Sequence, residues 1–107
     1  MATSSTDLRT LAAAADGLAA AAQHLVPSAK LTRGVVSGTG ATMTWSSQDG
    51  KRSVWVEITL AAAKDSKGIV PVDCYSKVVS DDCPSGATSR TSITLYEIPG
   101  ILRKLLR

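Results

Sequence analysis

The sequence predicts a single α+β domain, residues 1–107, in which an N-terminal helix packs on a curved four-stranded antiparallel sheet. Three observations lead to this fold class. Apolar residues recur every three or four positions near the N-terminus, strand-like alternation follows, and the connections between strands are too short for parallel crossovers. A chain of 107 residues also has the usual size of one domain.

The first element is a helix whose apolar positions run from Leu8 to Leu25. Ser4, Ser5 and Thr6 offer hydroxyls that can cap the helix, and Asp7 favours the first turn through its charge. Pro27 ends the helix, because the residue before a proline avoids helical geometry. The stripe expected to face the sheet consists of Leu8, Leu11, Ala15, Leu18, Ala22 and Leu25.

Four strands follow, at about 31–45, 53–60, 69–79 and 90–98. Glycines interrupt the first strand and suggest a bulge or bend. Asp49-Gly50 is a hairpin signal between the first and second strands. In the second strand one face carries Val54, Val56, Ile58 and Leu60, and the other carries Ser53, Trp55, Glu57 and Thr59. Residues 80–89 read as a polar turn, and residues 101–107 form a short basic amphipathic tail that we expect to pack on the domain.

Cys74 and Cys83 predict a structural disulfide that would close a loop of about ten residues and stabilise the domain by roughly 2–3 kcal/mol. Free thiols are the alternative. A metal site would need two further ligands, and the chain has one histidine and no other cysteine. The disulfide implies a secreted or extracytoplasmic protein whose leader lies outside this chain. Without the bond, a cytoplasmic protein with reduced cysteines is expected.

A candidate binding surface follows from strand parity. One choice of parity gathers five side chains on one side of the sheet: Trp55, Tyr75, Lys77, Thr94 and Tyr96. Exposed aromatic clusters on small domains often mark a site for a ligand or a partner. The alternative is that these rings cover a loop or the tail, or stiffen the sheet through cross-strand pairs. We expect the ligand to be a protein or a small molecule.

Several function classes are disfavoured by composition. The net charge is only +3, so a nucleic-acid partner is not expected. No run reaches the ~20 apolar residues of a membrane span. We find no metal cage, no phosphate-binding loop and no cofactor motif. His24, the only histidine, suits the end of the helix, where a charged imidazole complements the dipole. The alternative to this structural role, and to the expected protein without catalytic activity, is a small hydrolase that uses His24.

Part of the chain resembles the secreted cystatins. The segment from Asp73-Cys74 to Cys83-Pro84 and the following residues 93–99 are similar to the disulfide and the last strand of that family. The resemblance implies one helix on four antiparallel strands. The inhibitory motifs are absent: residues 47–51 replace the Gln-x-Val-x-Gly loop, residues 34–38 match it only loosely and lie too early, and Gly100 follows Pro99 where the family has Pro-Trp. A protease inhibitor with a changed reactive loop is an alternative function.

A second resemblance is to small secreted or lipid-anchored actinobacterial domains. It is carried by Leu25-Val26-Pro27, Gly38-Thr39-Gly40 and the close pair Cys74 and Cys83. Together with the absence of a catalytic set, it predicts an extracytoplasmic binding or protein-interaction module without catalytic activity. Exposed strand edges leave a homodimer formed by strand pairing or swapping open.

Overall fold

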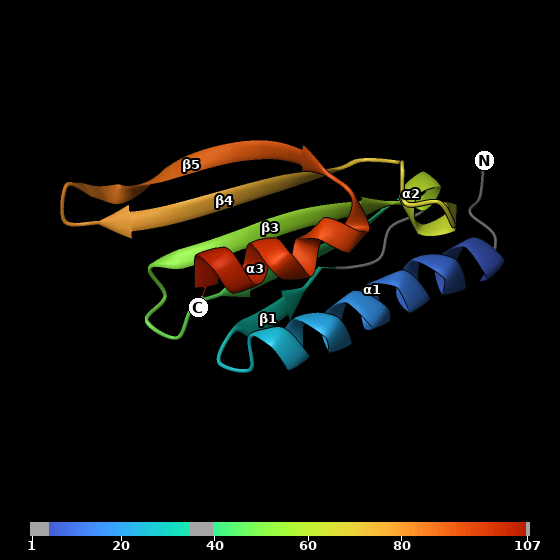
Figure 1. Cartoon of the computed structure of the whole chain (residues 1–107), viewed down its shortest axis with the longest axis horizontal. Coiled ribbons are helices and arrows are strands. Elements are labelled where there is room, and N and C mark those ends of the chain that lie inside the picture. Colours follow the sequence, from blue (N-terminus) through green and yellow to red (C-terminus); the bar gives the residue numbers. More distant parts are fainter. Residues whose placement is uncertain (1–4, 35–39, 107) are drawn as a thin grey trace.

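The computed structural model of the chain describes residues 5–34 and 40–106. These residues form a five-stranded antiparallel sheet in which every strand pairs with its neighbours in sequence (Figure 1). The α+β fold class and the N-terminal helix on the sheet are confirmed, with five strands in place of the expected four. The elements are α1 (Ser5–Leu25), β1 (Lys30–Arg33), β2 (Gly40–Ser46), β3 (Arg52–Thr59), α2 (Leu60–Lys64), β4 (Val72–Ser80), β5 (Cys83–Ile93), the 3-10 helix η1 (Leu95–Glu97) and α3 (Ile98–Leu106).

The additional strand arises because the segment expected as one bent strand is a hairpin. Residues 30–33 pair antiparallel with residues 43–46, so the glycines mark a reversal of the chain rather than a bulge. Gly34 donates its N–H to the Thr42 carbonyl at 2.8 Å. A Cβ at Gly34 would clash with the Thr42 hydroxyl, so a larger residue here would force the Thr42 side chain to move. Residues 35–39 of the expected strand lie outside the described residues, as does Ser4, one of the three proposed caps. The other two, Ser5 and Thr6, lie within α1.

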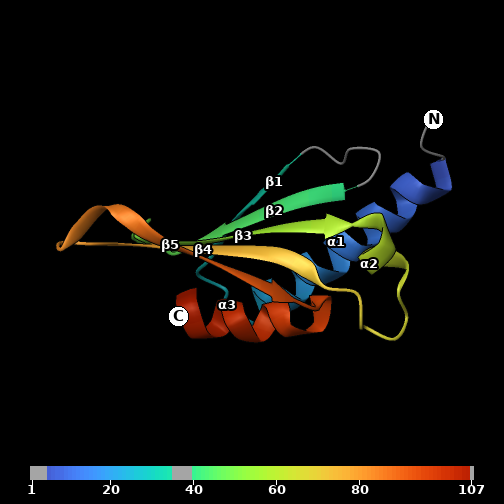
Figure 2. The same ribbon diagram turned by 90° about the horizontal axis from the view of Figure 1, so that it is seen from above.

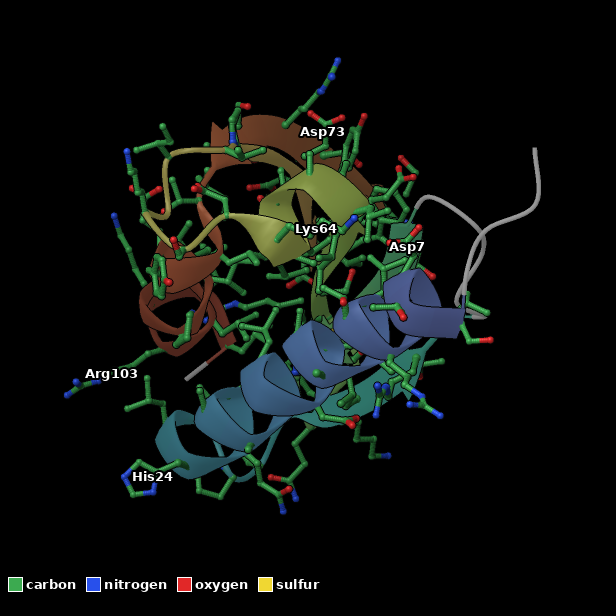
Figure 3. The ribbon with its side chains drawn as sticks, turned by 90° about the vertical axis from the view of Figure 1, so that its right-hand side faces the viewer. Asp7, His24, Lys64, Asp73 and Arg103 are labelled. Carbon is green, nitrogen blue, oxygen red and sulfur yellow. The ribbon has the colours of Figure 1, made fainter. Side chains whose placement is uncertain are left out.

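Helix α1 buries a narrower stripe than expected. Leu11, Ala15, Leu18 and Ala22 are buried, whereas Leu8 and Leu25 at the two ends are 39% and 36% exposed. Val26 is buried in place of Leu25, because the chain leaves the helix there and turns toward the sheet. The N-terminal end of α1 is tied to α2 by an ion pair of 2.9 Å between Asp7 and Lys64 (Figure 3).

Strand β3 confirms the expected alternation up to its last residue. Val54, Val56 and Ile58 are buried beneath the helices, and Trp55 points to the other side. Leu60 is not part of the strand, because Thr59 caps a short helix there. The Thr59 hydroxyl accepts a hydrogen bond from the Ala62 N–H at 3.2 Å, and α2 begins at Leu60.

The predicted disulfide is wrong, and both cysteines are free. The segment expected as a polar turn is itself extended: β5 begins at Cys83, and only Asp81 and Asp82 form the turn. Cys83 pairs with Ser80 at this end of the hairpin, whereas Cys74 pairs with Thr91 in the middle of the sheet. At ~3.3 Å per residue, the stretch of β4 from Cys74 to Ser80 spans about 20 Å. A disulfide needs Cα atoms within about 7 Å of each other.

The C-terminal segment packs on the domain, as expected. The fourth predicted strand ends at Ile93, and the chain then enters η1 and α3. Glu97 accepts the backbone N–H of Thr94 at 2.7 Å and its hydroxyl at 3.0 Å, which fixes the start of this helical segment. Pro99 lies in the first turn of α3, where a missing N–H costs little. Ile98, Leu102 and Leu106 are then buried against α1 and the sheet.

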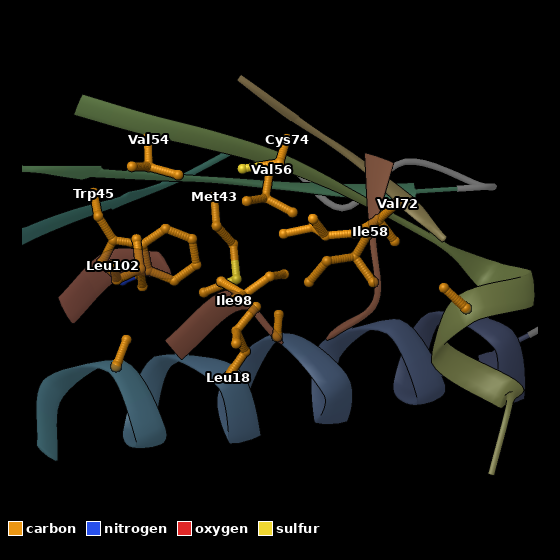
Figure 4. Close-up of a cluster of buried hydrophobic side chains, with 14 of the residues drawn as sticks. Leu18, Met43, Trp45, Val54, Val56, Ile58, Val72, Cys74, Ile98 and Leu102 are labelled. Atoms are coloured by element: carbon orange, nitrogen blue, oxygen red, sulfur yellow. The ribbon is translucent and has the colours of Figure 1, made fainter. Parts of the chain in front are cut away.

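The molecule has two layers (Figure 2). The helices α1, α2 and α3 lie on one side of the sheet, and none of the described helices covers the other side. The core lies between the layers, and its large members include Trp45, Met43, Ile58, Ile98 and Leu102 (Figure 4). Leu11 of α1 is fully buried as well. The chain has no phenylalanine, and Trp45 is the largest side chain of the core. We call the uncovered side of the sheet the outer face.

Candidate binding surface

The outer face is built by every second residue of the five strands. Antiparallel registers align these residues in rows across the sheet, because side chains alternate between the two sides of each strand. The row through the middle of the sheet consists of Thr32, Thr44, Trp55, Tyr75 and Arg90. Antiparallel sheets commonly leave one face in water, but such a face is usually lined by small polar residues rather than rings.

Trp55 and Tyr75 form the centre of this row. They are directly opposite each other on β3 and β4. Their ring centroids are 5.2 Å apart and the ring planes are tilted by 58°. Both side chains are partly exposed. Directly opposite aromatic residues stabilise a sheet, and partly exposed rings also offer apolar area to a partner at little cost in side-chain entropy.

Arg90 completes the row on the edge strand. Its Cζ lies 5.6 Å from the centroid of the Tyr75 ring, and its Nη2 donates to Asp73 Oδ1 at 3.0 Å. The hydrogen bond and the charge of Asp73 raise the pKa of the Arg90 guanidinium. Arg90 is therefore held over the ring and along its own sheet. Glu57 is opposite Asp73 on the adjacent row, so charges of both signs surround the ring pair.

The structure brings three of the five predicted residues together. Trp55, Tyr75 and Lys77 share the outer face, and the Lys77 side chain lies against Gly86 of β5. Thr94 and Tyr96 do not join them, because the chain leaves the sheet after Ile93. Thr94 caps η1. Tyr96 is 70% exposed and its ring packs against Gly68 in the loop before β4.

Arg90 was missed by the sequence interpretation, although a signal was present. In a strand that begins at Arg90, this residue has the same parity as Thr94 and Tyr96 and would share their face. The short polar residues that complete the outer face were missed as well. They include Thr42, Thr44, Thr88 and Ser92, which surround the rings with hydroxyl groups.

A groove on the other side of the molecule is the second candidate. It has a volume of about 350 Å³ and lies between α1, α2 and η1. The wall formed by α1 consists of Ala13, Ala14, Gly17, Leu18 and Ala21. Tyr96 stands at its rim. The Asp65 carboxylate accepts backbone hydrogen bonds from Lys67, Ile69 and Val70, which hold the adjoining loop and lower the pKa of Asp65.

His24 does not line this groove. It is exposed at the C-terminal end of α1 and points away from the body of the domain (Figure 3). Within residues 5–34 and 40–106, no three His, Cys, Asp or Glu side chains gather closely enough to hold a metal ion. No helix among the described residues is long and apolar enough to span a bilayer.

No family model, curated protein sequence or solved structure matches the chain. The resemblances to cystatins and to small actinobacterial domains therefore stay predictions.

Proposed function

We propose that this protein is a binding module without catalytic activity, and that it binds a protein partner on the outer face of its sheet. The observation that carries the proposal is the row formed by Trp55, Tyr75 and Arg90 at the centre of an uncovered sheet. Tyrosine, tryptophan and arginine are the residues that most often dominate the energy of protein interfaces.

The shape and charge of the outer face favour a protein over the other partner classes. Sites for small molecules are usually concave, whereas this site is the open side of a sheet. A nucleic-acid site would need a stripe of positive charge. Here the acidic Glu57 and Asp73 lie on one side of the ring pair and the basic Lys77 on the other, with Arg90 beside Tyr75. Mixed charges around an apolar centre match the polar rim of a protein interface.

The test places a photo-crosslinking amino acid at Thr44, beside Trp55, and exposes the protein to an extract of its own cells. A specific partner should be captured by this protein and lost when Trp55→Ala or Tyr75→Ala is added. Tyr96→Ala is the matched control, because it removes an exposed ring outside the outer face and should leave capture intact. Capture that is unaffected by all three changes contradicts the proposal. The same photo-crosslinking amino acid at Ala21, in the groove, tests whether a partner binds on the other side of the molecule instead.

The extracytoplasmic location stays a prediction, and it no longer has the disulfide as support. Homodimer formation by strand pairing or swapping also stays a prediction. The hydrolase and inhibitor alternatives have no feature of the described residues in their favour.

A further inference from the structure

The two edges of the sheet are protected to very different degrees. The edge strand β1 has four residues, of which Lys30 and Arg33 are charged. Arg33 also forms an ion pair with Asp16 of α1 at 2.6 Å, which ties this edge to the helix layer. Short length, charge and a covering helix are the devices by which native sheets prevent unwanted strand pairing.

The other edge strand, β5, lacks these devices along most of its length. It has eleven residues, and Arg90 is its only charged residue. Arg90 lies over Tyr75 and pairs with Asp73, so a single, partly neutralised charge protects a strand of eleven residues. Pro84 lies at the start of the strand, far from its middle. The run from Ala87 to Ser92 is exposed on both sides of the sheet, so no described element blocks the approach of another strand.

We propose that β5 pairs antiparallel with β5 of a second copy, about a two-fold axis through Ser89 that is perpendicular to the sheet. Such an axis makes two identical strands antiparallel and keeps each outer face on the same side. Gly86 has a positive φ of 88°, so the regular part of the strand begins at Ala87. The strand continues to Ile93, so the two candidate axes near its middle pass through Ser89 and Arg90.

Charge supports this register. With the axis at Ser89, Arg90 of one copy is opposite Thr88 of the other. With the axis at Arg90, the two guanidinium groups would be opposite each other, and like charges opposite each other destabilise a sheet. An unrelated extended peptide is the other conceivable occupant of the edge. A second copy is favoured because the edge is self-complementary in this register and is present at the concentration of the protein itself.

The dimer would have one continuous outer face. Its two Tyr75 rings would lie about 15 Å apart, from the spacing of strands and residues in a sheet. If the outer face binds a partner as proposed above, both copies would bind that partner together. The pairing of β5 with β5 does not depend on that proposed function.

The test measures the molar mass of the full chain by sedimentation equilibrium from about 1 to about 500 µM, because dimer formation depends on concentration. The mass should rise from 11.1 kDa toward twice that value. Thr88→Lys places like charges opposite Arg90 at two symmetric positions, and should raise the dissociation constant by roughly 2- to 30-fold. Thr88→Glu should lower it by a similar factor. Thr32→Lys, on the outer face of the opposite edge strand, is the control and should have no effect.

A mass that stays at 11.1 kDa over the whole range overturns the proposal. A dimer that responds to Thr32→Lys and ignores both Thr88 variants overturns it as well, because the contact would then involve β1. Circular dichroism of each variant confirms that the comparison is between folded proteins. The measurement needs no binding partner, so its failure is distinct from a failure of the crosslinking test of the outer face.

Discussion

Cys74 and Cys83 belong to the same hairpin but lie in different environments. Cys74 is in the middle of the sheet, opposite Thr91, and is 3% exposed among the core side chains (Figure 4). Cys83 begins β5 beside the Asp81-Asp82 turn and is partly exposed. The β4–β5 hairpin extends beyond the helices at this end, so the covered part of the sheet contains one cysteine and the extended part the other (Figure 1).

The two thiols should therefore differ in reactivity. In native protein at about pH 8, Ellman's reagent should modify Cys83 quickly and Cys74 only at the rate of unfolding. Burial raises the pKa of the Cys74 thiol, which lowers its thiolate fraction further. Cys83→Ser should abolish the fast phase, and Cys74→Ser should abolish only the slow one. Equal rates for the two thiols, or no free thiol in protein prepared without reductant, would contradict the structure.

The elements that the sequence predicted well are those with a sustained period. Leu11 and Leu18 fall on one helical stripe, and Val54, Val56 and Ile58 alternate strictly, so burial of each set follows from its spacing. The cysteine prediction failed because spacing in sequence does not give distance in space. Residues 83–89 have no buried side chain on either face, so their extended conformation depends on pairing with β4 rather than on a buried face.

The candidate site was predicted only where strand parity held. Trp55 and Tyr75 lie on long, regular strands, so the alternation of side chains along each strand was enough to predict that they share a face. Tyr96 was misplaced because the fourth strand was assumed to continue through Ile98. The pattern Thr94-x-x-Glu97 is a capping box, which starts a helical segment after Ile93 in place of a continued strand. The glycines between 34 and 40 likewise gave no means to distinguish a bend from a complete reversal of the chain.

Packing of α3 should contribute strongly to stability. Leu102 is fully buried between α1 and the sheet, so Leu102→Ala should lower the free energy of unfolding by about 3 kcal/mol. Leu105→Ala, at a half-buried neighbour on the same helix, should cost less than half as much. Urea denaturation followed by circular dichroism measures both values. Equal small losses, of roughly 1 kcal/mol or less, would mean that α3 does not pack on the domain.

Gly68 and Tyr96 provide a test of the loop that adjoins the groove. Gly68 has a φ of +70°, and a Cβ there would clash with the Tyr96 ring. Gly50 has a similar φ of +74° but nothing within 4 Å, so it is the matched control. Gly50→Ala should cost about 1–2 kcal/mol for the backbone alone, and Gly68→Ala should cost roughly 1 kcal/mol more.

A double-mutant cycle separates the two contributions at Gly68. In a Tyr96→Ala background the clash is removed, so Gly68→Ala should cost no more than Gly50→Ala does. Chemical denaturation of the four proteins of the cycle gives the coupling between the two residues. A coupling indistinguishable from zero would mean that Tyr96 does not pack on Gly68.

The acid dependence of stability should include a contribution from Asp65. Its carboxylate accepts hydrogen bonds from the N–H groups of Val70, Lys67 and Ile69, and these lower its pKa below the usual 3.8. A carboxyl with a lower pKa in the folded state stabilises the fold fully above its unfolded pKa. This stabilisation is lost as pH falls from about 4 through the folded pKa. Asp65→Asn should therefore flatten the loss of stability below about pH 4. Urea denaturation of the two proteins between about pH 2 and pH 6 measures the slopes, and identical slopes for Asp65→Asn and the unaltered chain would contradict the hydrogen-bonded role of Asp65.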